Sequence, residues 1–280
     1  MNFFDALVAD NERRALRAEL PPYVTDAVTP VPGMLAIGNS WSMRLFDGPF
    51  YITPASAARP ACSLVFVQSA DGNTGARDPG TLGGGETDKH LIYEGLSRVA
   101  ADAVLAGAET VRGSKMFLSV WHPELVALRA SLGKPRHPAQ IVATLEGLDL
   151  EAGVMFNVPH VPAVLLTVPP VAASMTRSLR DRPWITVVMM DRPEDLCGAF
   201  QRLRSMGIGT ISCIGGRTLA RQLLDARLVD DLYLTTAPRP GGEPGTPLHE
   251  KPWRGDLVVR KRGTGVEAGV VFEHVHAPSV

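Results

Sequence analysis

The chain has 280 residues, of which 45% are hydrophobic and 20% are charged, and its net charge is −1. This composition predicts one large globular domain, or one domain with an appendage. It excludes a strongly basic surface for nucleic acid, and no apolar stretch reaches the roughly 20 residues that span a bilayer. The first residues lack the pattern of a signal peptide, and the three cysteines are widely spaced. Both features indicate a cytoplasmic protein with free thiols.

Residues 1–60 are predicted to form an N-terminal extension. Residues 3–20 have the pattern of a charged amphipathic helix, and the prolines that follow favour extended chain. In "WSMRLFDGPFYIT" (41–53), an Asp-Gly pair separates two apolar arms, which predicts a β-hairpin. The pattern of the sequence changes after this segment, so we expect a second domain over residues 61–280.

From residue 61, short apolar runs alternate with helical patterns. Strands are predicted at residues 62–68, 103–107, 140–145, 163–168, 185–190, 210–216 and 230–238. Helices are predicted at residues 88–102, 193–207 and 217–228. Several strands are continuously apolar, as expected when both faces of a sheet are covered. The segment from residue 256 alternates and predicts a terminal hairpin, so the fold class is α/β, with a mainly parallel sheet and an antiparallel edge.

Two histidine patterns suggest metal sites but lack partners. "WHPE" (121–124) resembles half of a zinc deaminase site, but no Pro-Cys-x-x-Cys accompanies it. "HVH" (274–276) places two imidazoles on one strand face without a third ligand at a suitable spacing. We therefore predict no metal site.

Two glycine turns carry the strongest signal for a ligand. Gly107–Arg112 follows the strand "AVLA", and Gly215–Thr218 follows "TISCI" and precedes a helix. Free backbone N–H groups and the positive end of a helix dipole hold anions at such places, and glycine lets a phosphate approach closely. Thr110 and Thr218 add hydroxyls. Two such turns suit the two ends of a dinucleotide, and the plainer alternative is a pair of tight connections with capping threonines.

Three stretches resemble a known family in order and spacing: "QSADGNTGA", "SRVAADAVLAGAETVR" and "GGRTLARQLLDARLVDDLYLTTAP". They resemble the reductase domain of bacterial riboflavin biosynthesis, the RibD C-terminal family, over roughly residues 61–275. The resemblance implies a dihydrofolate reductase-like fold, which is a three-layer α/β/α sandwich around a mixed, mainly parallel sheet. Typical members use NADPH to reduce the ribosyl group of a phosphoribosylamino-pyrimidine to ribityl.

The resemblance also implies roles for individual residues. Those that match cofactor-binding positions are Val67, Gly107, Thr110, Gly215, Gly216, Arg217, Thr218 and Leu219. Ser69 and Asp71 fall beside the reacting centre as catalytic residues, where Asp71 would assist proton movement. Arg98 matches an arginine that would bind the phosphate of the substrate. From the residues alone, the plainer alternatives are an Asp-Gly turn residue for Asp71 and a solvated helix arginine for Arg98.

The chain departs from this family mainly on the substrate side. "GTLGGGETDKH" replaces a Gly-x-Ser-x-Trp-Ile stretch, Ile214 stands where a Glu usually precedes the glycine pair, and "TVRGSKMFLS" lacks an acidic run. Glu109 replaces a glycine beside the expected phosphate. Cofactor binding is therefore retained better than substrate binding.

The expected function is NADPH-dependent reduction of 5-amino-6-(5-phosphoribosylamino)uracil. One alternative is a reductase of the same fold that acts on another pterin-like or carbonyl substrate. Another is a non-catalytic protein that binds pyridine nucleotides. NADH is not excluded as the cofactor, although Thr144 is a candidate contact for the 2′-phosphate of NADPH. The expected partners are a small-molecule substrate and a second copy in a homodimer, with no nucleic acid and no membrane.

Overall fold

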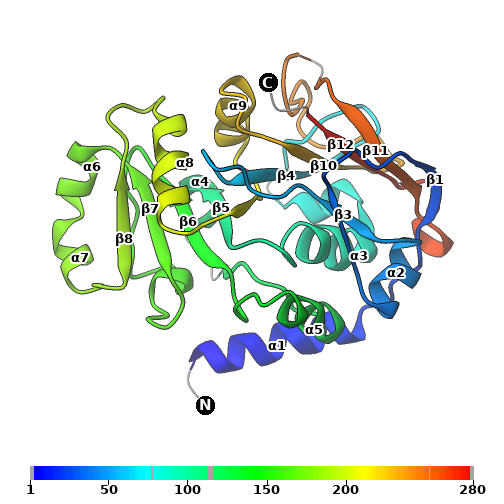
Figure 1. Cartoon of the computed structure of the whole chain (residues 1–280), viewed down its shortest axis with the longest axis horizontal. Coiled ribbons are helices and arrows are strands. Elements are labelled where there is room, and N and C mark those ends of the chain that lie inside the picture. The colour runs from blue at the N-terminus through cyan, green and yellow to red at the C-terminus, as the bar shows by residue number, and fades with distance from the viewer. Residues whose placement is uncertain (1–2, 77, 113–115, 252, 278–280) are drawn as a thin grey trace.

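A ten-stranded sheet forms the centre of the computed structural model, which describes residues 3–76, 78–112, 116–251 and 253–277. Its order is β1-β11-β12-β10-β4-β9-β5-β6-β7-β8 (Figure 1). The strands are β1 (Val24–Val28), β4 (Ala61–Gln68), β5 (Ala103–Gly107), β6 (Ala139–Ala143), β7 (Ala163–Thr167), β8 (Ile185–Met189), β9 (Thr210–Cys213), β10 (Asp231–Thr236), β11 (Asp256–Arg262) and β12 (Val271–His276). The seven strands from β10 to β8 are parallel, and β12, β11 and β1 join through antiparallel pairs. The predicted fold class and terminal hairpin are confirmed.

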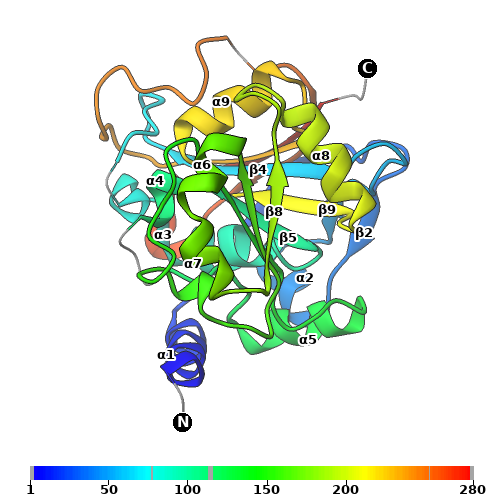
Figure 2. The ribbon, with the colours of Figure 1, turned by 90° about the vertical axis from the view of Figure 1, so that its left-hand side faces the viewer.

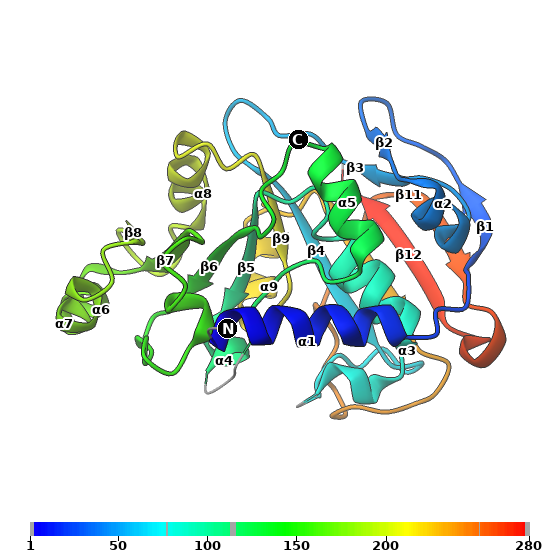
Figure 3. The same ribbon diagram turned by 90° about the horizontal axis from the view of Figure 1, so that it is seen from below.

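Helices cover both faces of this sheet and make three layers (Figures 2 and 3). One face carries α1 (Phe3–Arg17), α2 (Ser40–Phe46), the π-helix η2 (Asp88–Leu96) and α5 (Pro123–Ser131). The other face carries α8 (Leu196–Ser205) and α9 (Arg217–Asp225). Shorter helices are η1 (Pro79–Leu82), α3 (Gly85–Thr87), α4 (Ala108–Val111), η3 (Val154–Phe156), α6 (Pro169–Ser174), α7 (Thr176–Arg180) and η4 (Gly265–Glu267). In the described part of the chain, no helix has both the length and the apolar character needed to cross a membrane.

The hairpin predicted over residues 41–53 is wrong, because Ser40–Phe46 forms α2. A capping box starts this helix: the Ser42 amide donates to the Asn39 side chain at 2.8 Å, and the Asn39 amide donates to Ser42 Oγ at 2.9 Å. Asp47 ends the helix at φ 55°, so the Asp-Gly pair leads the chain out of a helix. The strands on either side of α2, β2 (Leu35–Ile37) and β3 (Phe50–Ile52), pair with each other.

Part of the N-terminal extension belongs to the main sheet. β1 pairs with β11 and forms one edge of the ten strands. The Tyr23 amide, just before β1, donates to the Leu45 carbonyl of α2 at 2.8 Å. The extension therefore contributes an edge strand to the main sheet. The division at residue 60 stays a prediction.

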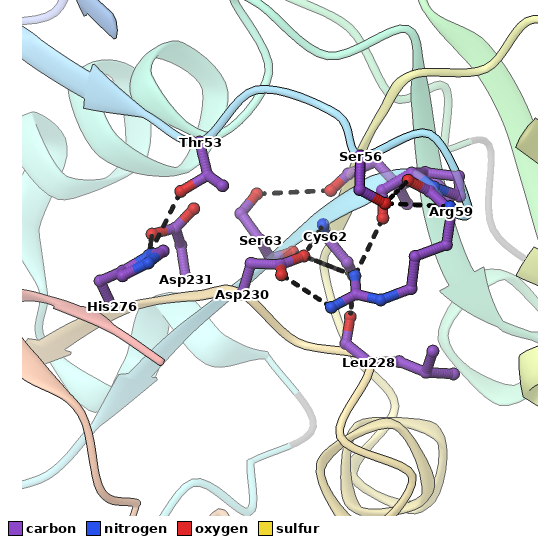
Figure 4. A network of polar contacts seen from close by, with 11 residues as sticks. Thr53, Ser56, Arg59, Cys62, Ser63, Leu228, Asp230, Asp231 and His276 are labelled. Atoms are coloured by element: carbon purple, nitrogen blue, oxygen red, sulfur yellow. Dashed lines mark hydrogen bonds and ion pairs between the residues drawn. The ribbon is translucent and has the colours of Figure 1, made fainter. Parts of the chain in front are cut away.

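A partly buried ion pair fastens the end of the extension to Asp230, the residue before β10 (Figure 4). The Arg59 guanidinium donates to both carboxylate oxygens of Asp230, at 2.7 and 2.8 Å. The Cys62 amide also donates to Asp230, at 2.8 Å. Because the Asp230 side chain is only 5% exposed, these three hydrogen bonds compensate for the loss of water around its carboxylate.

The two histidines of "HVH" (274–276) both contact Asp231, the residue that follows Asp230. His274 Nε2 and His276 Nδ1 each lie 2.9 Å from Asp231 Oδ1. Burial acts to raise the pKa of Asp231, but the bonds to the two histidines outweigh it and lower that pKa to about 2. The bond to Asp231 also raises the pKa of His276. These imidazoles therefore connect β12 to the amino end of β10 through Asp231.

Replacing Arg59 with Met is expected to lower the free energy of unfolding by about 3 kcal/mol, because it leaves the Asp230 carboxylate buried without its cation. Urea unfolding at neutral pH measures this loss. Arg13→Ala serves as the control, because the Arg13–Asp10 pair is 65% and 43% exposed and contributes about 0.5 kcal/mol or less. Equal losses in both variants would contradict the prediction.

Candidate active site at the carboxyl ends of the central strands

The two glycine turns meet in space. β5 and β9 are parallel neighbours, so Gly107 and Gly215, at their carboxyl ends, lie side by side. The Gly107 amide donates to the Gly215 carbonyl at 3.0 Å. A Cβ atom on Gly107 would lie 3.8 Å from Gly216 Cα, and one on Gly216 would lie 3.4 Å from Thr110 Oγ1. The turns therefore form one continuous backbone surface.

Each turn opens into a helix start whose amides are not capped by a side chain. Gly216 precedes α9 and Gly107 precedes α4, and no described side chain forms an N-cap hydrogen bond at either position. The first amides of a helix have no partner within it, so they are free to bind an anion. Gly216 has φ 67° and Gly215 has φ 116°, conformations that favour glycine. This backbone cradle fits the phosphates of a dinucleotide.

The charged residues of the turns already have partners on the protein. The Arg112 guanidinium lies 2.9 Å from the Glu109 carboxylate, which offsets the negative charge that replaces the usual glycine. Arg217, at the start of α9, lies 3.5 Å from Glu243 in the loop after β10. Thr218 is exposed next to it, and Leu219 is buried. Residues 113–115, within the stretch that lacks the acidic run, lie outside the described residues.

Thr144 does not face the cofactor surface with a free hydroxyl. Its side chain is 3% exposed, and its hydroxyl donates to the Gly147 carbonyl at 3.1 Å. The proposed contact with a 2′-phosphate stays a prediction, and this internal bond does not favour it.

Val67, Ser69 and Asp71 follow one another along β4 and the turn beyond it. Val67 of β4 pairs with Thr235 of β10. β4 is two strands from β5, which ends at Gly107. Ser69 is fully buried, and its hydroxyl bonds to the Asp71 carboxylate and to the Gly241 carbonyl. The bond from Ser69 lowers the pKa of the exposed Asp71. This geometry favours a role in holding the loop after β10, and the catalytic role of Ser69 and Asp71 stays a prediction.

Arg98 lies away from this edge of the sheet. It precedes β5, whereas Gly107 ends that strand. Its side chain is 2% exposed, donates to the Ser119 carbonyl at 3.0 Å and lies 4.1 Å from the centre of the Tyr93 ring. Arg98 is therefore not a solvated helix residue. The structure does not bring it to the glycine turns, so its role in binding the substrate phosphate stays a prediction.

Asp88 is the functional candidate that the sequence analysis missed. It begins η2, and its carboxylate accepts a hydrogen bond from the hydroxyl of Thr235, the β10 partner of Val67. Burial raises the pKa of Asp88 to about 7, Thr235 acts against the rise, and the charge of Glu267 adds to it. A carboxyl group that exchanges its proton near neutral pH is suited to general acid catalysis.

A continuous row of candidate groups thus runs along four adjacent strands. β10, β4, β9 and β5 carry, in that order, Thr235 with Asp88, Val67, the Gly215–Gly216 turn and Gly107. Three strand spacings correspond to about 14 Å, so one extended ligand can reach both ends of the row. In open parallel sheets, this edge is where ligands bind.

A family model for the RibD C-terminal domain matches residues 60–259, which is most of the chain. The chain belongs to the RibD C-terminal domain family. Membership of this family supports an oxidoreductase of the riboflavin-pathway type. A search of curated proteins gives no match.

Solved structures similar to this RibD C-terminal domain protein confirm the fold. A pyrimidine reductase-like protein from Corynebacterium diphtheriae is 23% identical, with a TM-score of 0.63 over 79% of this chain and 93% of that one. RibD of Acinetobacter baumannii is 17% identical, with a TM-score of 0.58 over 79% of this chain and 59% of that one. The deaminase/5-amino-6-(5-phosphoribosylamino)uracil reductase of Thermotoga maritima is 16% identical, with a TM-score of 0.51 over 78% and 57%.

Asp71→Asn is expected to lower turnover less than tenfold, because a carboxylate with a lowered pKa is already ionised at neutral pH and does not serve as a proton donor. Its loss should instead weaken the loop after β10, because Asp71 also accepts from the Gly241 amide at 3.4 Å. Steady-state turnover and the rate of limited proteolysis within residues 237–255 measure the two effects. A loss of a hundredfold or more with an intact loop would restore Asp71 as the acid.

Proposed function

We propose that this protein is an NADPH-dependent reductase that transfers a hydride to a pyrimidine-linked substrate, with 5-amino-6-(5-phosphoribosylamino)uracil as the first candidate. The observation that carries the proposal is the contact between the two glycine turns at the carboxyl ends of β5 and β9. It supports a single pyrophosphate cradle built from segments about a hundred residues apart.

The residues of this edge fit a dinucleotide. The amides that begin α9 and α4 would hold the phosphates, and Thr110 and Thr218 would add hydroxyls. The backbone of Val67 would lie against the nicotinamide. When bound, the reduced nicotinamide supplies the hydride. NADH would fit the same cradle, so the choice of NADPH rests on the family.

Asp88 would supply the proton that balances the hydride. Reduction of a C=N or C=O bond places negative charge on nitrogen or oxygen, and a neighbouring acid stabilises that charge by donating its proton. Thr235 orients the Asp88 carboxyl, and burial keeps a proton on it near pH 7. Asp88 is therefore the residue that we assign as the general acid.

A second candidate function is reduction of another pterin-like or carbonyl substrate by the same machinery. Asp88 lies in "GTLGGGETDKH", the stretch that replaces the family's Gly-x-Ser-x-Trp-Ile pattern. An ionisable group in that place supports a different substrate from that of typical members.

One assay separates these functions. Oxidation of NADPH is followed with the ribosylamino-pyrimidine phosphate and, in parallel, with dihydrofolate. Oxidation with the first supports the riboflavin-type step, and oxidation with the second supports the alternative. Tight binding of NADPH without oxidation in the presence of either compound would favour a non-catalytic nucleotide-binding protein.

A further inference from the structure

Nine buried side-chain polar atoms lack hydrogen-bond partners within the described part of the chain, and two of them, Tyr23 Oη and Glu267 Oε2, belong to residues near Asp88. Their residues are only 2% and 8% exposed. Both lie outside residues 60–259, which match the family model. A buried polar atom without a partner costs free energy, so it calls for a ligand or another explanation.

Both side chains lie beside Asp88. The Thr235 hydroxyl donates to Asp88, and Thr235 pairs in register with Phe272 of β12. Paired residues project from the same face of a sheet. The centroids of the Tyr23 and Phe272 rings are 6.3 Å apart. Tyr23 therefore contacts the residue that pairs with Thr235.

Glu267 approaches Asp88 from the loop between β11 and β12. Its Oε1 accepts from the Thr87 amide at 3.1 Å, and Thr87 directly precedes Asp88. Burial raises the pKa of Tyr23, and the charges of Asp88 and Glu267 raise it further, as expected if all three groups are close. Tyr23, Asp88 and Glu267, which come from distant segments of the chain, thus lie close to one another.

Two consecutive glycines, Gly84 and Gly85, lie against the carboxyl groups of Asp88 and Glu267. A Cβ on Gly84 would lie 2.7 Å from Asp88 Oδ2, and one on Gly85 would collide with the Glu267 carboxyl group. Gly85 is exposed and has φ 87°. A side chain at either glycine would therefore crowd the carboxyl groups, and Asp88 itself remains partly exposed.

We propose that Tyr23 and Glu267, together with Asp88, recognise the amino-substituted edge of the substrate ring. A carboxyl group offers acceptor oxygen atoms whether it is ionised or protonated, and a phenol can accept one hydrogen bond. Their complement is a planar nitrogen heterocycle with neighbouring N–H donors, such as an aminopyrimidine. The proposal rests on the proposed function for the position of this ring beside the cofactor. It makes the N-terminal extension, through Tyr23, a determinant of substrate specificity.

The test uses 5,6-diaminouracil as the probe, titrated calorimetrically into the full-length protein with and without NADPH. Tyr23→Phe and Glu267→Gln are each expected to weaken binding of the probe tenfold or more, because each removes a hydrogen bond to the ligand. Tyr51→Phe, a phenol of the extension on β3, is the matched control and should bind like the wild type.

Thermal unfolding of the ligand-free variants separates recognition from a structural role. Tyr23→Phe removes an unpaired hydroxyl and keeps the ring, so its Tm should equal or exceed that of the wild type. A lower Tm with unchanged affinity for the probe would overturn the proposal. Failure of the wild type to bind the probe, with NADPH still bound, would overturn it too. Loss of NADPH binding alone, with the probe still sensitive to both substitutions, would overturn the proposed function and leave this inference standing.

Discussion

Asp88→Asn is expected to slow turnover by about a hundredfold or more while leaving the affinity for NADPH unchanged. Asparagine retains the shape and the hydrogen bond with Thr235 but has no proton to give at neutral pH. Stopped-flow oxidation of NADPH with the active substrate measures the step, and equilibrium fluorescence titration measures cofactor binding. Asp78→Asn is the matched control, because Asp78 caps η1 in the same loop and asparagine caps equally well.

The dependence on pH adds a second readout for Asp88. Its pKa is raised to about 7 in the folded protein, so the protonated acid is present below that pH and is lost above it. The wild-type rate should therefore fall as pH rises through 7, and the Asp88→Asn rate should lack this fall. A flat wild-type profile, or a variant with the same titration, would assign the proton to another group.

The same shift predicts the sign of a stability effect. Between about pH 4 and pH 7, folded Asp88 keeps a proton that the unfolded chain has released, so stability falls as pH rises through this window. Asp88→Asn should remove that part of the dependence. Urea unfolding of the wild type and the variant at several pH values measures the difference.

Gly216→Ala is expected to weaken NADPH binding tenfold or more. The new Cβ would lie 3.4 Å from Thr110 Oγ1, on the surface where the two turns meet, and would occupy space needed by a phosphate. Isothermal titration with NADPH measures the affinity.

Gly133→Ala is a close control for the backbone effect. Gly133 has φ 69° against 67° for Gly216, and a Cβ there would have no described atom within 4 Å. Both variants should lose stability, by about 1–2 kcal/mol or more, because a side chain is unfavourable at positive φ. Equal NADPH affinity in the two variants would contradict the cradle.

The elements of the sheet could be predicted because their signals are local. The continuous apolar runs of β5, β6 and β7 are typical of strands covered on both faces, and the alternating C-terminal segment is typical of an antiparallel pair. The pattern of residues 41–53 predicts a hairpin where α2 (Ser40–Phe46) forms, because an Asp-Gly pair is common to hairpins and helix ends. Its capping box, Asn39 with Ser42, was the local signal that could have found it.

The glycine turns were recognisable from sequence, since glycine after a strand and before a helix is a local pattern with a physical reason. Asp88 was not, because a carboxyl group before a helix is ordinarily a solvated cap. Its properties come from Thr235, Glu267 and Tyr23, which are far from it along the chain. No local pattern contains that arrangement.

The sequence by itself determined most strands of the large sheet, the two glycine turns and the family, because these depend on hydrophobic periodicity and on the conformational freedom of glycine. Only the tertiary structure decided which groups share a site. The pairing of β5 with β9 brings the turns into contact, and the pairing of β10 with β12 sets Asp88 beside Tyr23. Burial then changes the protonation of Asp88, and burial is a property of packing rather than of residue type.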